Sequence, residues 1–246
     1  MEGTGLCPEC TRAAAVPGPP SPSHPTYPSP PPGAYGPVPV SVDGLTSAVV
    51  VLLGVCIAGD LFSLVAEGLV YAAADAAAAH RAVDFVTMAA GLQALGVVSC
   101  GVLFIIWMGR VRFNAEIYSP DGQRLSSRWV FWGWVLPVVN FWYPRRMVAD
   151  IWRSSVPWRA GEGVPRLAAG PINLWWACWL AVLVGEWFVA DPASDASLGT
   201  LRGAAVQWAL LDLVDIAAAA LAIVVVLTIA RAQRAKNALG APYLLV

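Results

Sequence analysis

Long runs of apolar residues dominate the pattern of this chain. Four of them reach the ~20 residues that a helix needs to cross a hydrocarbon core of ~30 Å. They cover about Leu45–Ala73, Phe85–Met108, Pro171–Ala190 and Ala204–Ala230. The pattern therefore predicts an all-α polytopic membrane protein with four transmembrane helices.

A fifth apolar run, Trp129–Tyr143, is shorter and contains a proline. Its fifteen residues would form a straight helix of only ~22 Å. Pro137 lies in its middle and interrupts the ladder of helical hydrogen bonds. This run therefore either spans the membrane with a distortion or enters and leaves on the same side as a re-entrant segment.

The placement of the basic residues favours the re-entrant alternative. Fourteen Arg and one Lys are present, and short cytoplasmic loops carry the excess of such residues. If Trp129–Tyr143 does not cross and the N-terminus is cytoplasmic, thirteen basic residues lie inside and two outside. If it crosses, the better orientation gives nine and six. We therefore expect a multi-pass protein of the plasma membrane with both termini cytoplasmic.

The first 43 residues have a different composition from the rest. They hold twelve of the twenty prolines and almost no aliphatic residues, so they cannot bury a core and should be disordered. This predicts a cytoplasmic tail (1–43), a helical membrane domain (44–235) and a short C-terminal tail (236–246). The proline-rich tail is either a linker or a docking strip for a proline-reading partner.

Cys7 and Cys10 form a C-x-x-C knuckle within this tail. A closed structural zinc site needs four ligands, and no second pair follows. Zinc binding would need His24 or the knuckle of a second chain, and the alternative is an idle knuckle. We predict no other cofactor.

Composition supports the membrane assignment and excludes one class of partner. Hydrophobic residues make up 58% of the chain and charged residues only 13%, whereas soluble domains have about 45–50% and 25%. A soluble domain of this size could not cover its surface with so few charges. The net charge of −1 gives no sign of nucleic-acid binding.

Five carboxylates lie within the predicted spans. They are Asp60, Glu67, Glu186, Asp212 and Asp215. A charged carboxylate at the bilayer centre costs ~2.5–3.5 kcal/mol and should face protein or water. No basic residue in a predicted span could neutralise them. They either line a cation- or proton-binding cleft that opens to the outside, or lie satisfied in the interface and between helices.

The segment after Pro144 has the pattern of an amphipathic helix. Met147, Val148, Ile151 and Trp152 share one side, and Arg145, Arg146, Asp150 and Arg153 lie mostly on the other. This suits an interfacial helix on the inner leaflet, where arginines meet anionic headgroups. The alternative is a helix that packs on the cytoplasmic end of the bundle.

The central block also contains polar residues that could be functional. Arg110 and Asn114 are four residues apart and share a helical face. The amide of Asn140 could pair with the backbone that Pro137 leaves broken at membrane depth.

These residues belong to a longer motif. Its members are Trp107, Arg110, Asn114, Trp134, Pro137, Asn140, Pro144, Asp150 and Trp152. The motif and the order of the spans resemble the actinobacterial membrane family catalogued as domain of unknown function 4328, over about residues 45–235. The resemblance implies that these residues matter, but it implies no activity.

Three functional hypotheses follow, and an enzyme ranks last among them. The chain has no HExxH, G-x-S-x-G or P-loop motif, so a lipid-modifying enzyme would have no visible nucleophile. The first hypothesis is a binding or scaffold protein whose basic inner face (Arg145, Arg146 and Arg153) meets lipid headgroups, a protein partner or a second copy. The second is a small cation or proton transporter or channel that uses the intramembrane carboxylates.

Overall fold

The computed structural model describes residues 37–157, 169–189 and 191–239. The chain divides into two units, Met1–Gly36 and Pro37–Val246, and all described residues belong to the second. Every regular element in this described part is helical. The class predicted from the sequence, an all-helical protein, is therefore confirmed for these residues.

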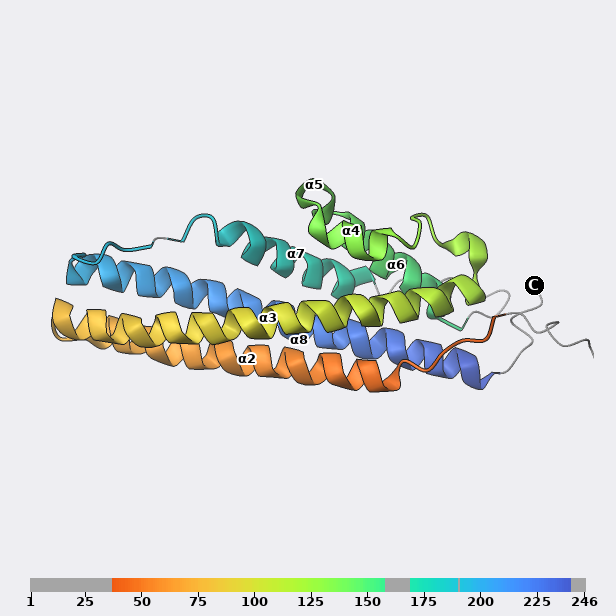
Figure 1. Cartoon of the computed structure of the whole chain (residues 1–246), viewed down its shortest axis with the longest axis horizontal. Coiled ribbons are helices and arrows are strands. Elements are labelled where there is room, and N and C mark those ends of the chain that lie inside the picture. The colour runs from red at the N-terminus through yellow and green to blue at the C-terminus, as the bar shows by residue number, and fades with distance from the viewer. Residues whose placement is uncertain (1–36, 158–168, 190, 240–246) are drawn as a thin grey trace, which may run out of the picture. The chain divides into compact units, whose positions relative to one another are not determined.

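Three long helices, α2 (Asp43–Ala72), α3 (Ala76–Tyr118) and α8 (Leu198–Ala238), pack side by side (Figure 1). All three are long and apolar enough to cross a membrane. Asp75 caps α3 by accepting a hydrogen bond from the Ala78 N–H, and Ser197 caps α8 in the same way from Thr200. Large apolar side chains such as Leu61, Phe62 and Leu95 remain exposed, as expected for helices with lipid around them.

The helix boundaries differ from those predicted. The second span, predicted as Phe85–Met108, is the middle of a helix that runs from Ala76 to Tyr118, because the helix continues beyond the apolar run at both ends. The third, predicted as Pro171–Ala190, is α7 (Ala169–Gly185). Its 17 residues give a length of ~25 Å, which is shorter than the ~30 Å hydrocarbon core.

The fifth apolar run forms two short helices that double back. α4 (Trp129–Val135) ends at Leu136, whose extended backbone precedes Pro137, and α5 (Pro137–Asn140) begins at that proline. The next helix, α6 (Tyr143–Ser155), returns alongside α4 and packs on α3 (Figure 1). The break at Pro137 therefore lies where the sequence predicted it.

The prediction that the apolar face of α6 lies in the inner leaflet is wrong. Met147, Val148 and Ile151 are completely buried in the main hydrophobic core, against residues of α3 and α8. A helix whose apolar side chains are already covered by protein has none left for lipid on that face. The alternative interpretation, that this helix packs on one end of the bundle, is the one that the structure bears out.

Candidate functional site

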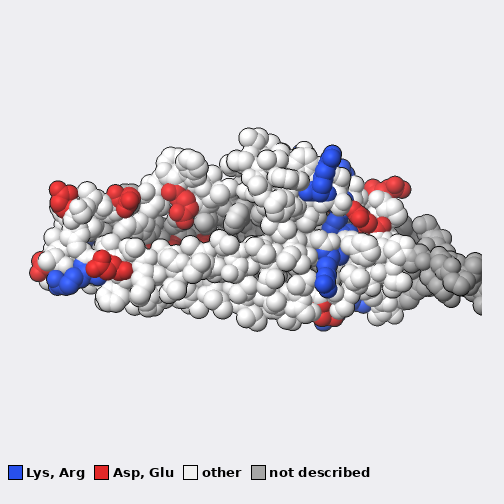
Figure 2. Space-filling view, viewed as in Figure 1, with Lys and Arg blue, Asp and Glu red and all other residues white. Residues whose placement is uncertain are grey.

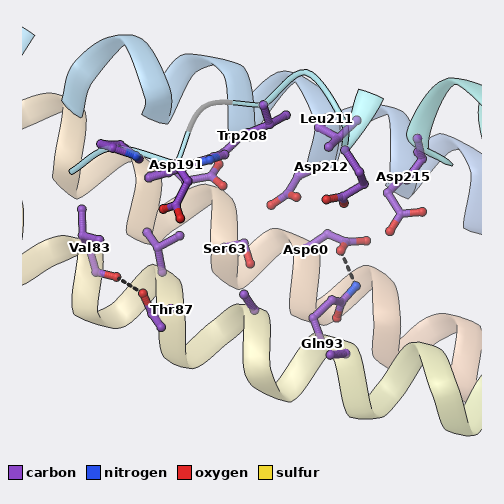
Figure 3. A pocket seen from close by; sticks show the side chains of 18 of the residues that line it. Asp60, Ser63, Val83, Thr87, Gln93, Asp191, Trp208, Leu211, Asp212 and Asp215 are labelled. Carbon is purple, nitrogen blue, oxygen red and sulfur yellow. Dashed lines mark hydrogen bonds between the residues drawn. The ribbon is translucent and has the colours of Figure 1, made fainter. Parts of the chain in front are cut away.

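All five predicted intramembrane carboxylates line one cavity. Its volume is about 1070 Å³, and its walls come from α2, α3, α7, α8 and the loop between α7 and α8. Figure 3 shows Asp60 on α2 and Asp212 and Asp215 on α8 directed toward the space between the helices. Asp60 lies twelve residues from the end of α2 at Ala72, so the cavity reaches ~18 Å into the bundle.

The deepest carboxylates are incompletely satisfied. Asp60 is only 2% exposed, and its Oδ1 accepts a hydrogen bond from Gln93 Nε2 (Figure 3). Gly59 makes this approach possible, because a Cβ there would overlap the Gln93 side chain. Asp60 Oδ2, Glu67 Oε2 and Asp212 Oδ2 are buried without a hydrogen-bond donor, and the carboxyl groups of Glu67 and Asp212 lie close enough to share a proton. A buried polar atom without a hydrogen bond raises the free energy of the folded protein. A proton or a bound cation would provide the missing partner.

The charge of the cavity wall is strongly negative. Seven carboxylates line it, among them Asp84 and Asp191 near its mouth, while Arg81 is its only arginine and pairs with no acid in the described part of the chain. Figure 2 shows acidic side chains, with one basic group among them, toward the left end of this face, and a band of basic side chains right of centre with further acidic ones beside it. The carboxylates are spread around the cavity and do not meet at one point, since no three potential metal ligands converge among the residues described.

A second, smaller cavity of about 270 Å³ adjoins the first. Phe104, Trp134, Trp175 and Trp179 line it, together with small residues of α8. Asp215 and Trp179 line both cavities. This aromatic cavity could not be predicted from the sequence, because its tryptophans come from segments that are distant along the chain.

The role predicted for Asn140 is wrong. Its side chain makes no hydrogen bond with the described backbone, and its Oδ1 is buried without a partner. A bond to the backbone just after α5 comes from Trp176 instead, whose Nε1–H donates to the carbonyl of Phe141 at 3.0 Å. Asn140 lines the aromatic cavity, where its amide can meet a ligand.

Asn114 lies at the centre of a buried polar network near the ends of α3 and α8. Its side chain accepts from the Val40 N–H at 2.8 Å and donates to the Val40 carbonyl at 2.8 Å and to Gln233 Oε1 at 2.9 Å. Gln233 Nε2 donates to the Val111 carbonyl and to Ser155 Oγ. This network joins four segments and explains why an amide is needed at position 114.

Arg110 does not share these surroundings. Asn114 is completely buried, whereas Arg110 is exposed and has no partner among the described side chains. The two residues, which their spacing places on one helical face, therefore do not come together in one site. Trp107, one turn before, is also completely buried, and its Nε1–H donates to Thr46 Oγ1 at 3.0 Å, which joins α3 to α2.

Asp150 and two of the three predicted inner-face arginines make contacts within the protein. Asp150 is 2% exposed, not on the solvent side of α6. Arg124 contacts both of its carboxylate oxygens at 2.8–3.1 Å, and Arg153 donates to Oδ1 at 2.9 Å. These hydrogen bonds and the charge of Asp150 raise the pKa of Arg124 above its ordinary value. Arg145 donates to Asn173 Oδ1, and Arg146 is exposed.

The remaining motif residues build the hairpin of α4 to α6. Trp134 packs edge-on against Trp176 and Trp179, with ring centroids 6.1 and 5.8 Å apart. Pro144 is buried in the first turn of α6, and Trp152 packs against the main core. Cys7 and Cys10 lie outside the described residues.

The fold and the site define an all-helical protein in its described part. Its long helices could cross a membrane, and they surround a cavity that is lined with carboxylates. The chain belongs to the family described as Domain of unknown function (DUF4328), whose model matches residues 71–231. The resemblance noted from the motif is thereby confirmed. No curated protein and no solved structure matches the chain.

Proposed function

We propose that this protein is a small transporter or channel that takes cations or protons into its acidic cavity. The observation that carries this proposal is the convergence of seven carboxylates, three of them with unpaired buried oxygens, on one cavity with a single arginine. A cation entering from water gains the attraction of several carboxylates within low-dielectric walls, where such attraction is strong. The absence of converging metal ligands among the described residues favours protons or a larger cation over a dehydrated metal ion.

The topology that fits this role has four spans, α2, α3, α7 and α8, and a re-entrant α4–α5 hairpin. The cavity mouth then faces outward, and both termini and most arginines face the cytoplasm, as the distribution of basic residues favours. α7 reaches across because the bilayer can thin locally around a short helix.

Sided thiol labelling in intact cells tests this topology. In a variant without the native cysteines, single cysteines replace Ser126, Arg146 and Asp195, all of which are exposed. We expect Ser126→Cys and Arg146→Cys to label only after permeabilisation, because the hairpin does not cross. Asp195→Cys should label in intact cells, because α7 crosses. Labelling of Ser126→Cys and Arg146→Cys from opposite sides would contradict the re-entrant hairpin.

The variant Asp60→Asn tests the proposed role of the acidic cavity most directly. It keeps the Oδ1 that accepts from Gln93 and removes only the ionisable group, so the fold should persist. We expect the protein in liposomes to carry proton or monovalent-cation flux above that of empty vesicles, and Asp60→Asn to lower this flux at least ~10-fold, which corresponds to about 1.4 kcal/mol. A pH-sensitive dye inside the vesicles measures proton flux under an imposed pH gradient, and Na⁺- and K⁺-sensitive dyes measure cation flux under imposed Na⁺ and K⁺ gradients.

Asp195→Asn is the matched control. It makes the same acid-to-amide change in the loop between α7 and α8, but Asp195 does not line the cavity and is exposed, so its flux should equal that of the wild type. The proposal fails if wild-type vesicles conduct no better than empty ones, or if Asp60→Asn conducts as well as the wild type.

A second candidate role is binding of anionic headgroups or a protein partner at the basic face. Arg110, Arg128 and Arg146 are exposed and have no partner in the described part of the chain, which supports this role. It ranks second because Arg145 and Arg153, which the sequence singled out, already contact Asn173 and Asp150.

A further inference from the structure

The acidic cavity and the aromatic cavity adjoin along one wall. Val97, Trp179 and Asp215 line both. Asp215 lies about 26 Å along α8 from its start at Leu198, and it makes no hydrogen bond or ion pair with the residues that the structure describes. A ligand that enters the acidic cavity therefore meets a free carboxylate at the entrance to the aromatic cavity.

The walls of the aromatic cavity suit a flat apolar group. Phe104, Trp134, Trp175 and Trp179 provide rings, and Ala218, Ala219 and Ala222 leave room opposite them. Trp134 makes contacts with Phe104 and Trp179 at centroid distances of 5.6 and 5.8 Å, so the rings support one another in place. Burial of an aromatic group among such rings contributes through apolar area and ring–ring geometry.

Three polar atoms of residues that line this cavity have no partner. They are Trp134 Nε1, Trp179 Nε1 and Asn140 Oδ1, each buried without a hydrogen bond. Buried polar atoms are almost always paired, and an exception indicates something that binds there. The indole N–H groups need an acceptor and the amide oxygen needs a donor. A hydroxyl group is both.

We infer that the ligand of this protein is an amine with an aromatic body: its ammonium group pairs with Asp215, its ring enters the aromatic cavity, and a polar group on the ring meets Asn140 and the indole N–H groups. This inference rests on the proposed cation-handling role and gives it a substrate class. The aromatic rings add a cation–π attraction where the ammonium group lies over the face of a ring. A proton or an inorganic cation would leave the aromatic cavity and its unpaired atoms unused.

Four probes separate the parts of this inference. Tyramine carries the ammonium group, the ring and the hydroxyl; phenethylamine lacks the hydroxyl; methylamine lacks the ring; and 2-phenylethanol lacks the charge. Isothermal titration calorimetry of the full chain in lipid nanodiscs measures their affinities at neutral pH. We expect tyramine to bind most tightly, phenethylamine several-fold more weakly, and methylamine and 2-phenylethanol at least ~10-fold more weakly than phenethylamine.

Two variants assign the contacts. Asp215→Asn should reduce binding of both aromatic amines at least ~10-fold and leave 2-phenylethanol unchanged. Asn140→Leu should remove the advantage of tyramine over phenethylamine. Because the Asn140 Oδ1 has no partner to lose, the fold should persist, and an unchanged thermal unfolding midpoint checks this. Asp195→Asn is again the control and should bind all four probes as the wild type does.

The outcomes distinguish the ligand class from the underlying role. If methylamine binds as tightly as phenethylamine, or if no amine binds while the liposomes still conduct, the aromatic-amine inference fails and the cation-handling role stands. If 2-phenylethanol binds as tightly as phenethylamine, the site is merely apolar and the inference fails. If neither binding nor flux is observed, both fail.

Discussion

Asn114→Leu should lower the free energy of unfolding by about 2–4 kcal/mol. The substitution removes three hydrogen bonds, two to the Val40 backbone and one to Gln233. An interhelical hydrogen bond in a membrane protein contributes only ~0.6 kcal/mol on average, but an orphaned buried acceptor costs about 1–3 kcal/mol more. Gln233 is 1% exposed, so water cannot replace the lost amide. Unfolding by SDS in mixed micelles measures the change.

A double-mutant cycle with Gln233→Leu distinguishes the network from simple repacking. Both single variants remove the bond between Asn114 and Gln233, and the double variant removes both polar partners at once. Its cost should therefore be smaller than the sum of the two by about 1 kcal/mol or more. Asn237→Leu is the control, because Asn237 is exposed and makes one hydrogen bond, to Tyr118, so its loss should stay below ~1 kcal/mol. Equal losses at positions 114 and 237 would contradict the assignment.

The sequence predicted the apolar helices and the break at Pro137 because both depend on local chemistry. A run of apolar residues and a proline act on the chain within a turn or two, whatever the rest of the fold does. The helix boundaries were not predicted, since α3 continues at both ends beyond its apolar run. Its N-terminus at Asp75 had a local signal, because Asp is a favoured N-cap residue.

The grouping of the acids was also foreseeable in part. Carboxylates in an apolar span cannot face lipid, so those on α2 and α8 had to turn toward protein, and the structure places them around one cavity. Gln93 was missed, although an amide in the middle of an apolar run was a usable signal. It donates to Asp60 from the neighbouring helix.

The contacts of α6 could not be predicted because they depend on distant residues. Its pattern of apolar and basic positions is the same whether lipid or protein covers the apolar face. Only the packing of α3 and α8 decides this, and it buries Met147, Val148 and Ile151. In the same way, the partner of Asp150 is Arg124, 26 residues away, and the donor to the Phe141 carbonyl is Trp176, 35 residues away.

The motif residues therefore serve two different purposes. Trp107 and Asn114 hold helices together through buried hydrogen bonds, and Asp150 holds the loop before α4 against α6. Trp134 and Asn140 line the aromatic cavity with unpaired polar atoms. A screen that ranks motif substitutions only by lost activity would mix these two groups, whereas a stability measurement on the same variants separates them.

The combined substitution of Arg124 and Arg153 by Ala should cost about 3–5 kcal/mol of stability, far more than either alone. Asp150 has a side chain that is only 3% exposed and relies on these two cations. The arginines themselves are 60% and 56% exposed, so each single substitution should cost no more than ~1 kcal/mol while the other arginine remains. When both are absent, an unpaired charge stays buried, which is the costly case. SDS unfolding in mixed micelles measures all three variants.

Adding Asp150→Asn to the double variant should restore at least half of the lost stability. The amide has nearly the shape of the carboxylate but carries no charge, so the buried site no longer needs a cation. A merely geometric role for the arginines, in which they hold the loop before α4 against α6, predicts no such recovery. Failure of the triple variant to recover, or a double variant within ~1 kcal/mol of the wild type, would show that the charge of Asp150 is not what the arginines stabilise.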